Sequence, residues 1–271
     1  MEMQVSCRIK STGTSGRLSC EPQMLGGFQV RTGLMLLKAV DGNSDYGVSP
    51  RQQLPVAVDY SGLARIQHPR RRNEWLAGRL CLSRAISLGW SEVATKGVIV
   101  AEELGNTQGG RPRFIVESKD RVYLSVSHSD GFAGGLVSEC RCGLDIEPIS
   151  YGALRAVKAV FEDAELELLG KTFGEPLNCW RGTAMWTLYE ALSKAVGAPV
   201  LGRRLRIVAA SKDPSADGRR QIRIATPSQF EAKHRVPAGF ESETTIYNNV
   251  AVSVVTTVDQ EGLEIGKELN Q

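Results

Sequence analysis

Hydrophobic and polar positions alternate with two different periods along the chain, and the two periods predict helices and strands. Three helices are predicted, at about 70–88, at 154–169 and from an N-cap at Thr183 through Val196. Gly89 and Gly197 fit the ends of the first and last of these helices. Strands are predicted around 33–37 and at 97–101, 122–127, 134–137, 142–146, 205–209, 221–225, 244–247 and 249–257.

The order of these elements predicts an α+β fold divided into two halves. A chain of 271 residues has room for one large domain or for two lobes of about 130 residues each. We place an N-terminal lobe at 1–139 and a C-terminal lobe at 140–271. Residues 1–60 have weak periodicity and many glycines and serines, so the elements within them are poorly assigned.

Composition narrows the classes of function. The chain is 42% hydrophobic and 23% charged, with a net charge of +3, which is too mild to predict bulk nucleic-acid binding. No apolar run approaches the roughly 18 residues of a membrane span, and 1–14 lacks the apolar centre of a signal peptide, so we expect a cytoplasmic protein. The six cysteines are scattered and lack zinc-site spacing, so we expect reduced structural thiols.

Two acidic residues alternate with apolar ones in the predicted strand at 142–146 and just beyond it. Asp145 and Glu147 are two residues apart and would point to the same face of a strand. Such a pair can be an ordinary solvated face, because charged residues are mostly exposed. The apolar neighbours Leu144 and Ile146 favour a buried strand, and carboxylates at the end of a buried strand often line a site.

A third carboxylate and a lysine lie one turn apart on the last predicted helix. Glu190 and Lys194 have the spacing of a common surface ion pair, and periodicity alone does not show whether their face meets solvent or a site. Together with Asp145 and Glu147 they could supply Mg²⁺ with hard oxygen ligands and provide a catalytic base. This combination favours phosphoryl-type chemistry.

Cationic residues gather at three other places. The helix at 70–88 begins with Arg70, Arg71 and Arg72, which oppose the helix dipole, so an anion docked there would be stabilising. His128 lies between two serines at a predicted turn over 127–131, where it could donate to a phosphate or be a satisfied turn residue. Arg111 follows a glycine-rich loop, and guanidinium binds phosphate bidentately, although loop arginines are often simply solvated.

Read in order, these motifs resemble the 4'-phosphopantetheinyl transferase superfamily, in its larger two-lobed, surfactin-synthetase-activating type. The resemblance is carried by RRRNEWLAGR at 70–79, GRPRF at 110–114, SVSHS at 125–129, GLDIE at 143–147 and WTLYEALSK at 186–194. It implies transfer of 4'-phosphopantetheine from coenzyme A to a serine of an apo acyl or peptidyl carrier protein, with release of adenosine 3',5'-bisphosphate.

The resemblance also implies roles for individual residues. Asp145, Glu147 and Glu190 would bind Mg²⁺, Glu190 would help to deprotonate the carrier serine, and Lys194 would stabilise the pyrophosphate oxygens. Coenzyme A would be bound by Arg70, Arg72, Arg111, Ser127 and His128.

The implied architecture is a pseudo-dimer of two similar α+β lobes with the active site in the cleft between them. A chain that carries both lobes is expected to be a monomer, with coenzyme A and a carrier protein as partners and neither nucleic acid nor membrane. The carrier could belong to fatty-acid, polyketide or nonribosomal-peptide synthesis, and we expect residues 160–169 to contact it.

One position departs from the family pattern, because Tyr189 stands where many members have a basic residue. The loss of that charge would weaken coenzyme A binding or change the pH profile. Two alternatives remain open: another Mg²⁺-dependent phosphoryl enzyme, such as a phosphodiesterase, and a degenerate coenzyme A-binding scaffold module.

Overall fold

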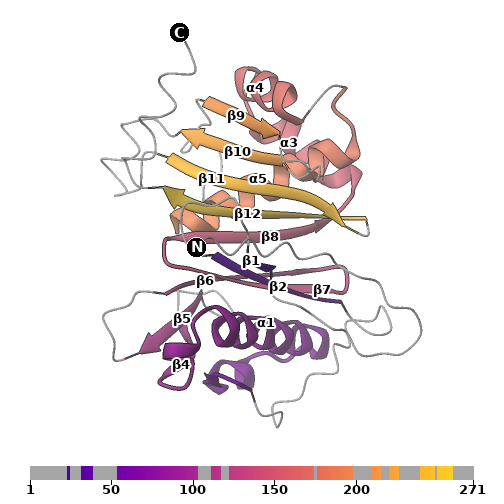
Figure 1. Cartoon of the computed structure of the whole chain (residues 1–271). Coiled ribbons are helices and arrows are strands. Elements are labelled where there is room, and N and C mark those ends of the chain that lie inside the picture. Colours follow the sequence, from indigo (N-terminus) through magenta and orange to yellow (C-terminus); the bar gives the residue numbers. More distant parts are fainter. Residues whose placement is uncertain are drawn as a thin grey trace, which may run out of the picture. The chain divides into compact units, whose positions relative to one another are not determined.

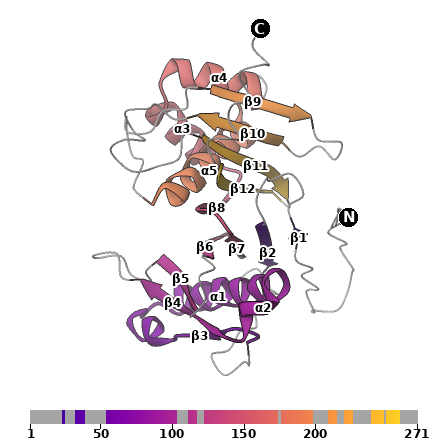
Figure 2. The same cartoon turned by 60° about the vertical axis from the view of Figure 1, so that its left-hand side comes forward.

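The computed structural model has a mixed α/β fold (Figures 1 and 2). It describes residues 23–24, 32–38, 54–102, 111–116, 122–173, 176–197, 209–214, 220–225, 239–247 and 249–258. These residues form five α-helices, one short 3-10 helix and three small sheets. No described helix combines the length and the apolar character that crossing a membrane requires.

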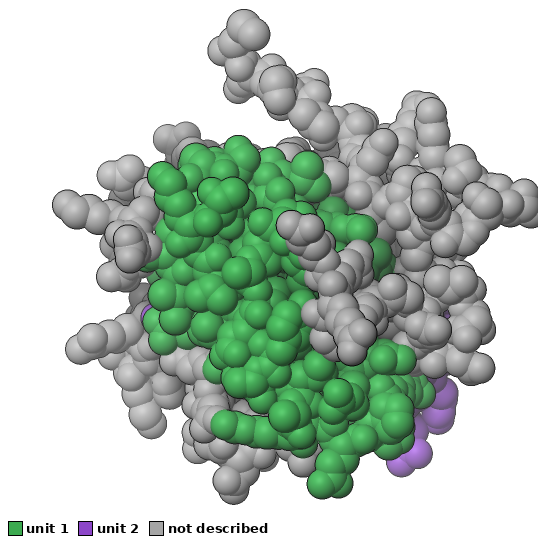
Figure 3. All heavy atoms as spheres, turned by 90° about the horizontal axis from the view of Figure 1, so that it is seen from below, with its two compact units in different colours: residues 1–139 green, residues 140–271 purple. Residues whose placement is uncertain are grey.

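The chain divides into two compact units, which Figure 3 distinguishes by colour. Unit 1 is Met1–Glu139 and unit 2 is Cys140–Gln271. Each unit has its own hydrophobic core, built on a long helix that packs against an antiparallel sheet.

Unit 1 is built around a four-stranded antiparallel sheet of order β1-β2-β7-β6. Its strands are β1 (Gln23–Met24), β2 (Thr32–Lys38), β6 (Tyr123–Ser129) and β7 (Phe132–Ser138). Helix α1 (Pro69–Gly89) packs on β7 and β2, with Leu82 and Ile86 fully buried in the core. The remaining elements are η1 (Ser61–Arg65), α2 (Ser91–Ala94) and a smaller sheet of β3 (Ala57–Val58), β4 (Gly97–Glu102) and β5 (Arg111–Val116).

Unit 2 is built around a five-stranded antiparallel sheet of order β8-β12-β11-β10-β9. The strands are β8 (Cys142–Pro148), β9 (Ala209–Pro214), β10 (Arg220–Ala225), β11 (Gly239–Tyr247) and β12 (Val250–Val258). Helix α5 (Cys179–Val196) packs along β8 and β12, and α3 (Tyr151–Val160) and α4 (Asp163–Phe173) pack around it. Its core contains Phe173, Met185, Leu188 and Phe240, all nearly inaccessible to solvent.

The structure corrects two helix boundaries. The predicted helix at 154–169 is two helices, because Phe161 is extended (φ −82°, ψ 144°) and the Glu165 carboxylate accepts a hydrogen bond from the Glu162 N–H at 3.1 Å, which starts α4. The N-cap of α5 is Asn178, whose side chain accepts from the Arg181 N–H at 3.1 Å. Thr183 lies one turn inside the helix, and its hydroxyl donates to the Cys179 carbonyl.

Two segments that the sequence predicted as a turn or loop belong to strands. Ser127–Ser129 are paired in β6, and the turn is the two-residue loop Asp130–Gly131, in which both residues have positive φ, as a tight hairpin turn requires. Arg111 and Arg113 lie on β5, paired with β4, and not in a loop. Of the predicted strand at 205–209 only Ala209 is described, as the first residue of β9; the rest lies outside the described residues.

Candidate functional site

Strand β8 directs its acidic residues toward helix α5. Gly143, Asp145 and Glu147 alternate along the strand and therefore share one face. A Cβ atom on Gly143 would overlap the carbonyl oxygen of Ala191 on α5, which places this face directly beneath the helix. Glycine at this position therefore allows the close approach that brings α5 to the carboxylates.

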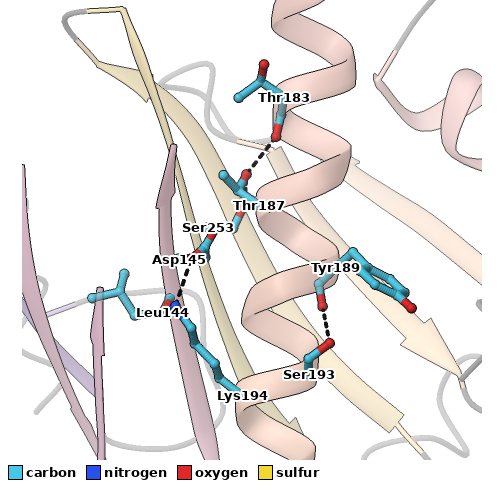
Figure 4. Close-up of polar contacts among 8 residues, drawn as sticks. All are labelled: Leu144, Asp145, Thr183, Thr187, Tyr189, Ser193, Lys194 and Ser253. Carbon is cyan, nitrogen blue, oxygen red and sulfur yellow. Dashed lines mark hydrogen bonds and ion pairs between the residues drawn. The ribbon is translucent and has the colours of Figure 1, made fainter. Parts of the chain in front are cut away.

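Helix α5 presents Lys194 to the same strand (Figure 4), and Glu190 lies one turn earlier on the helix. Lys194 Nζ donates to Asp145 Oδ1 at 2.7 Å and to the Leu144 carbonyl at 2.9 Å. The Asp145 side chain is 6% exposed, whereas that of Lys194 is 34% exposed. The lysine is therefore not a surface ion pair of Glu190; it bridges the helix to the strand and neutralises a buried carboxylate.

Glu190 lies half-buried beside this pair, and its pKa is raised from the ordinary value of 4.5. Burial is the main cause, the negative charge of Asp145 adds to it, and the charge of Lys194 opposes it. A bound cation would relieve the repulsion between the Glu190 and Asp145 carboxylates. Glu147, on the same face, is partly exposed at the end of the strand.

The three predicted ligands do not form a closed metal cage. Among the described residues, no group of three or more His, Cys, Asp or Glu side chains is placed to hold a metal ion. Asp145 and Glu190 lie close enough for their charges to interact, and Glu147 is two residues further along β8 than Asp145. The donor set of hard carboxylate oxygens is the kind that Mg²⁺ takes, usually with substrate phosphates and waters completing the shell.

Three buried hydroxyls fix α5 on the sheet next to these carboxylates. The Thr187 and Ser253 hydroxyl oxygens are 2.8 Å apart, and those of Ser253 and Thr244 are 2.9 Å apart. All three residues are buried, and Ser253 pairs with Asp145 across β12 and β8. This polar network sets the register of α5 against the strand that carries Asp145, and the sequence analysis did not find it.

Tyr189 belongs to the core. Its ring packs edge-on against Phe161, with the ring centroids 5.1 Å apart, and lies tilted to Trp186, with the centroids 6.0 Å apart. The residue is 4% exposed. Its neighbour Glu190 is on another side of the helix, next to β8. The side chain at 189 therefore stabilises the packing of α5 against α3.

Unit 1 holds a second group of predicted site residues. Arg70 Nε donates to Glu74 Oε1 at 3.0 Å, and His128 Nδ1 lies 3.3 Å from Glu74 Oε2. Arg70 and Glu74 are one turn apart on α1, and His128 reaches them from β6. The sequence analysis missed Glu74, although an acid four residues after Arg70 in a basic stretch is a recognisable ion-pair spacing.

The other cationic predictions have different surroundings. Arg72 Nη1 donates to the carbonyls of Leu63 and Ile66 at 3.1 and 3.3 Å, so it holds the end of η1. Ser127 is buried on β6, and Arg111 lies on β5, in the smaller sheet. Within 160–169, Phe161 and Leu169 are core residues, whereas Val160, Leu166 and Leu168 are only partly buried.

Comparison with known families finds a match within unit 2. Residues 141–255 match the family model of the 4'-phosphopantetheinyl transferase superfamily. The match covers β8 through most of β12, and with them Asp145, Glu147, Glu190 and Lys194. No curated protein matches the chain. Over this segment the chain is similar to enzymes that transfer phosphopantetheinyl groups.

Proposed function

We propose that this protein transfers the 4'-phosphopantetheine group of coenzyme A to a serine of an apo acyl or peptidyl carrier protein, in a Mg²⁺-dependent reaction that releases adenosine 3',5'-bisphosphate. The observation that carries the proposal is the contact of Lys194 with buried Asp145, beside Glu190, inside the segment that matches the superfamily. Two neighbouring carboxylates that hold Mg²⁺, with a lysine beside them, would suit the binding and neutralisation of a pyrophosphate.

Asp145 and Glu190 are the residues that would hold Mg²⁺, with Glu147 as the third ligand. The support for this set is chemical: oxygen donors, a shared face of β8, and a Glu190 carboxylate destabilised by burial and by its neighbour. When bound, the metal supplies charge neutralisation at the attacked phosphoryl group.

Glu190 and Lys194 have distinct roles in the proposed reaction. A carboxylate with a raised pKa is a better proton acceptor near neutral pH, so Glu190 suits removal of the proton from the carrier serine. The Lys194 side chain is about one third exposed, and its positive charge would stabilise the negative charge developing on the leaving pyrophosphate oxygens.

The cationic residues of unit 1 are proposed to bind the phosphates of coenzyme A. Arg70 and His128 are the best supported, because one carboxylate joins them and both keep exposed surface. Arg72, Arg111 and Ser127 are proposed on the resemblance alone. We further propose a cytoplasmic monomer in which two similar lobes form the active-site cleft.

The test is incubation of the purified protein with coenzyme A, Mg²⁺ and a panel of apo carrier proteins, followed by mass spectrometry. The expected result is a gain of one phosphopantetheine on a carrier serine. Hydrolysis of coenzyme A with every carrier unmodified would instead support a phosphodiesterase. Binding of coenzyme A with neither reaction would support a scaffold module.

A further inference from the structure

Glu74 is a buried acidic residue that contacts the basic start of α1. Its side chain is 8% exposed, whereas those of Arg70 and His128 are 55% and 36% exposed. The carboxylate uses its two oxygens for two different residues, Oε1 for Arg70 Nε and Oε2 for His128 Nδ1. The buried Glu74 thus contacts both Arg70 on α1 and His128 on β6, which lie 58 positions apart in the chain.

This arrangement is unexpected for a surface that only attracts phosphate. A carboxylate reduces the positive charge of the cluster, so by charge alone it would weaken anion binding. Its contribution must come from the geometry it imposes on the two cations. Because Nε of Arg70 is taken, the terminal guanidinium nitrogens remain for a ligand.

The same reasoning applies to His128. The Glu74 carboxylate oxygen, 3.3 Å from Nδ1, favours the ring form that carries its proton on Nδ1. Nε2, the second ring nitrogen, is a donor whenever the ring is protonated. The face of β6 that carries His128 is turned toward α1, because Val126, on the same face, lies 3.5 Å from the Cβ that Gly78 of α1 would carry.

We infer that Glu74 is a positioning residue that orients Arg70 and His128 together to receive one phosphate group of a nucleotide ligand. The inference rests on the proposed function, since it deepens the coenzyme A-binding role given there to Arg70 and His128. Glu74 itself does not touch the ligand; it acts through the two residues that do.

Glu74→Gln separates orientation from packing. Glutamine has the shape of glutamate, and its carbonyl oxygen still accepts from Arg70 Nε, but its amide nitrogen cannot accept a proton from His128 Nδ1. The chain has three histidines, so the ring nitrogens of His128 are assigned by comparing ¹⁵N spectra with those of His128→Asn. The expected result is a shift of the His128 ring away from the Nδ1-protonated form in Glu74→Gln. An unchanged His128 spectrum would overturn the inference.

Binding is measured by calorimetry with adenosine 3',5'-bisphosphate and with coenzyme A. Glu74→Gln is expected to weaken both at least about tenfold, as loss of a charged hydrogen bond predicts. In the His128→Asn background the same change is expected to cost less than about twofold, because the residue through which Glu74 acts is gone. Equal weakening in both backgrounds would show that Glu74 does not act through His128.

Turnover provides the remaining test, with Glu92→Gln as the matched control. Glu92 is an exposed glutamate on α2 of the same unit, and its substitution is expected to leave binding unchanged. In Glu74→Gln, KM for coenzyme A should rise while kcat at saturating coenzyme A falls much less. A wild-type protein that binds both nucleotides but modifies no carrier would refute the proposed transferase alone, since spectra and calorimetry test Glu74 without turnover. A wild-type protein that binds neither nucleotide would refute the inference about Glu74.

Discussion

Lys194→Met is expected to destabilise the fold more than Asp145→Asn, although both remove the same contact. The two side chains differ in burial: that of Asp145 is 6% exposed and that of Lys194 is 34% exposed. Removing the lysine leaves a buried carboxylate with no ammonium beside it and takes a donor from the Leu144 carbonyl. We expect the free energy of unfolding to fall by about 3 kcal/mol in Lys194→Met. This is the lower end of the range for breaking a buried ion pair, because the lysine is partly solvated.

Asp145→Asn keeps an oxygen that can accept from Lys194, and the ammonium can reach water, so its expected cost is about 1 kcal/mol. The free energy of unfolding is measured by urea titration followed by circular dichroism. In the double variant the two losses should not add, and about 1–2 kcal/mol should be recovered, because no buried charge is left without a partner.

The matched control is the Glu167–Lys171 pair, which has the same 2.7 Å separation but side chains that are 66% and 70% exposed. Lys171→Met should change stability far less than Lys194→Met, because exposed pairs contribute little. Equal costs for the two lysine substitutions, or strict additivity at Asp145 and Lys194, would refute the claim that burial makes this contact strong.

Two further predictions concern the packing and charge of α5. Without metal, Glu190→Gln should have a larger free energy of unfolding than wild type at pH values above the raised pKa of Glu190. The gain should shrink as the pH falls through that pKa toward 4.5, because the half-buried carboxyl group is destabilising only when it is ionised. Mg²⁺ should raise the melting temperature of wild type more than that of the variant. Gly143→Ala should cost about 1–3 kcal/mol and lower activity by pushing α5 from β8, whereas Gly152→Ala on α3, where the added Cβ meets nothing closer than 3.7 Å, should be neutral or stabilising.

The sequence predicted the elements of the site better than their contacts. Helix α1 and strand β8 were found within about one residue at their starts, because their apolar periodicity and bounding glycine or proline residues are local signals. The start of α5 was predicted wrongly, because Thr183 and Asn178 are both good N-caps and the choice depends on packing of the first turn. Strand β5 was missed because its exposed positions, such as Arg113 and Ile115, mix charge with apolar surface.

Contacts between distant elements could not be predicted from local pattern. Spacing suggested that Lys194 pairs with Glu190, its neighbour one helical turn away, whereas the ammonium reaches across to Asp145, 49 residues earlier. Glu74 was overlooked for the same reason, because its role becomes visible only when β6 brings His128 to α1. The residue pattern allowed the carboxylates to be grouped as a Mg²⁺ site, and the resemblance to a family favoured that grouping over solvated surface acids.

The most direct test of the central claim, that Asp145 belongs to the catalytic centre of a phosphopantetheinyl transferase, is the rate of carrier modification by Asp145→Ala. It is measured by mass spectrometry over a range of Mg²⁺ concentrations, with the folded state of the variant checked by circular dichroism. We predict a fall in rate of at least about a hundredfold while the fold is retained, with loss of the Mg²⁺ response that the proposed function predicts for wild type. A folded variant that modifies the carrier at close to the wild-type rate would contradict the account.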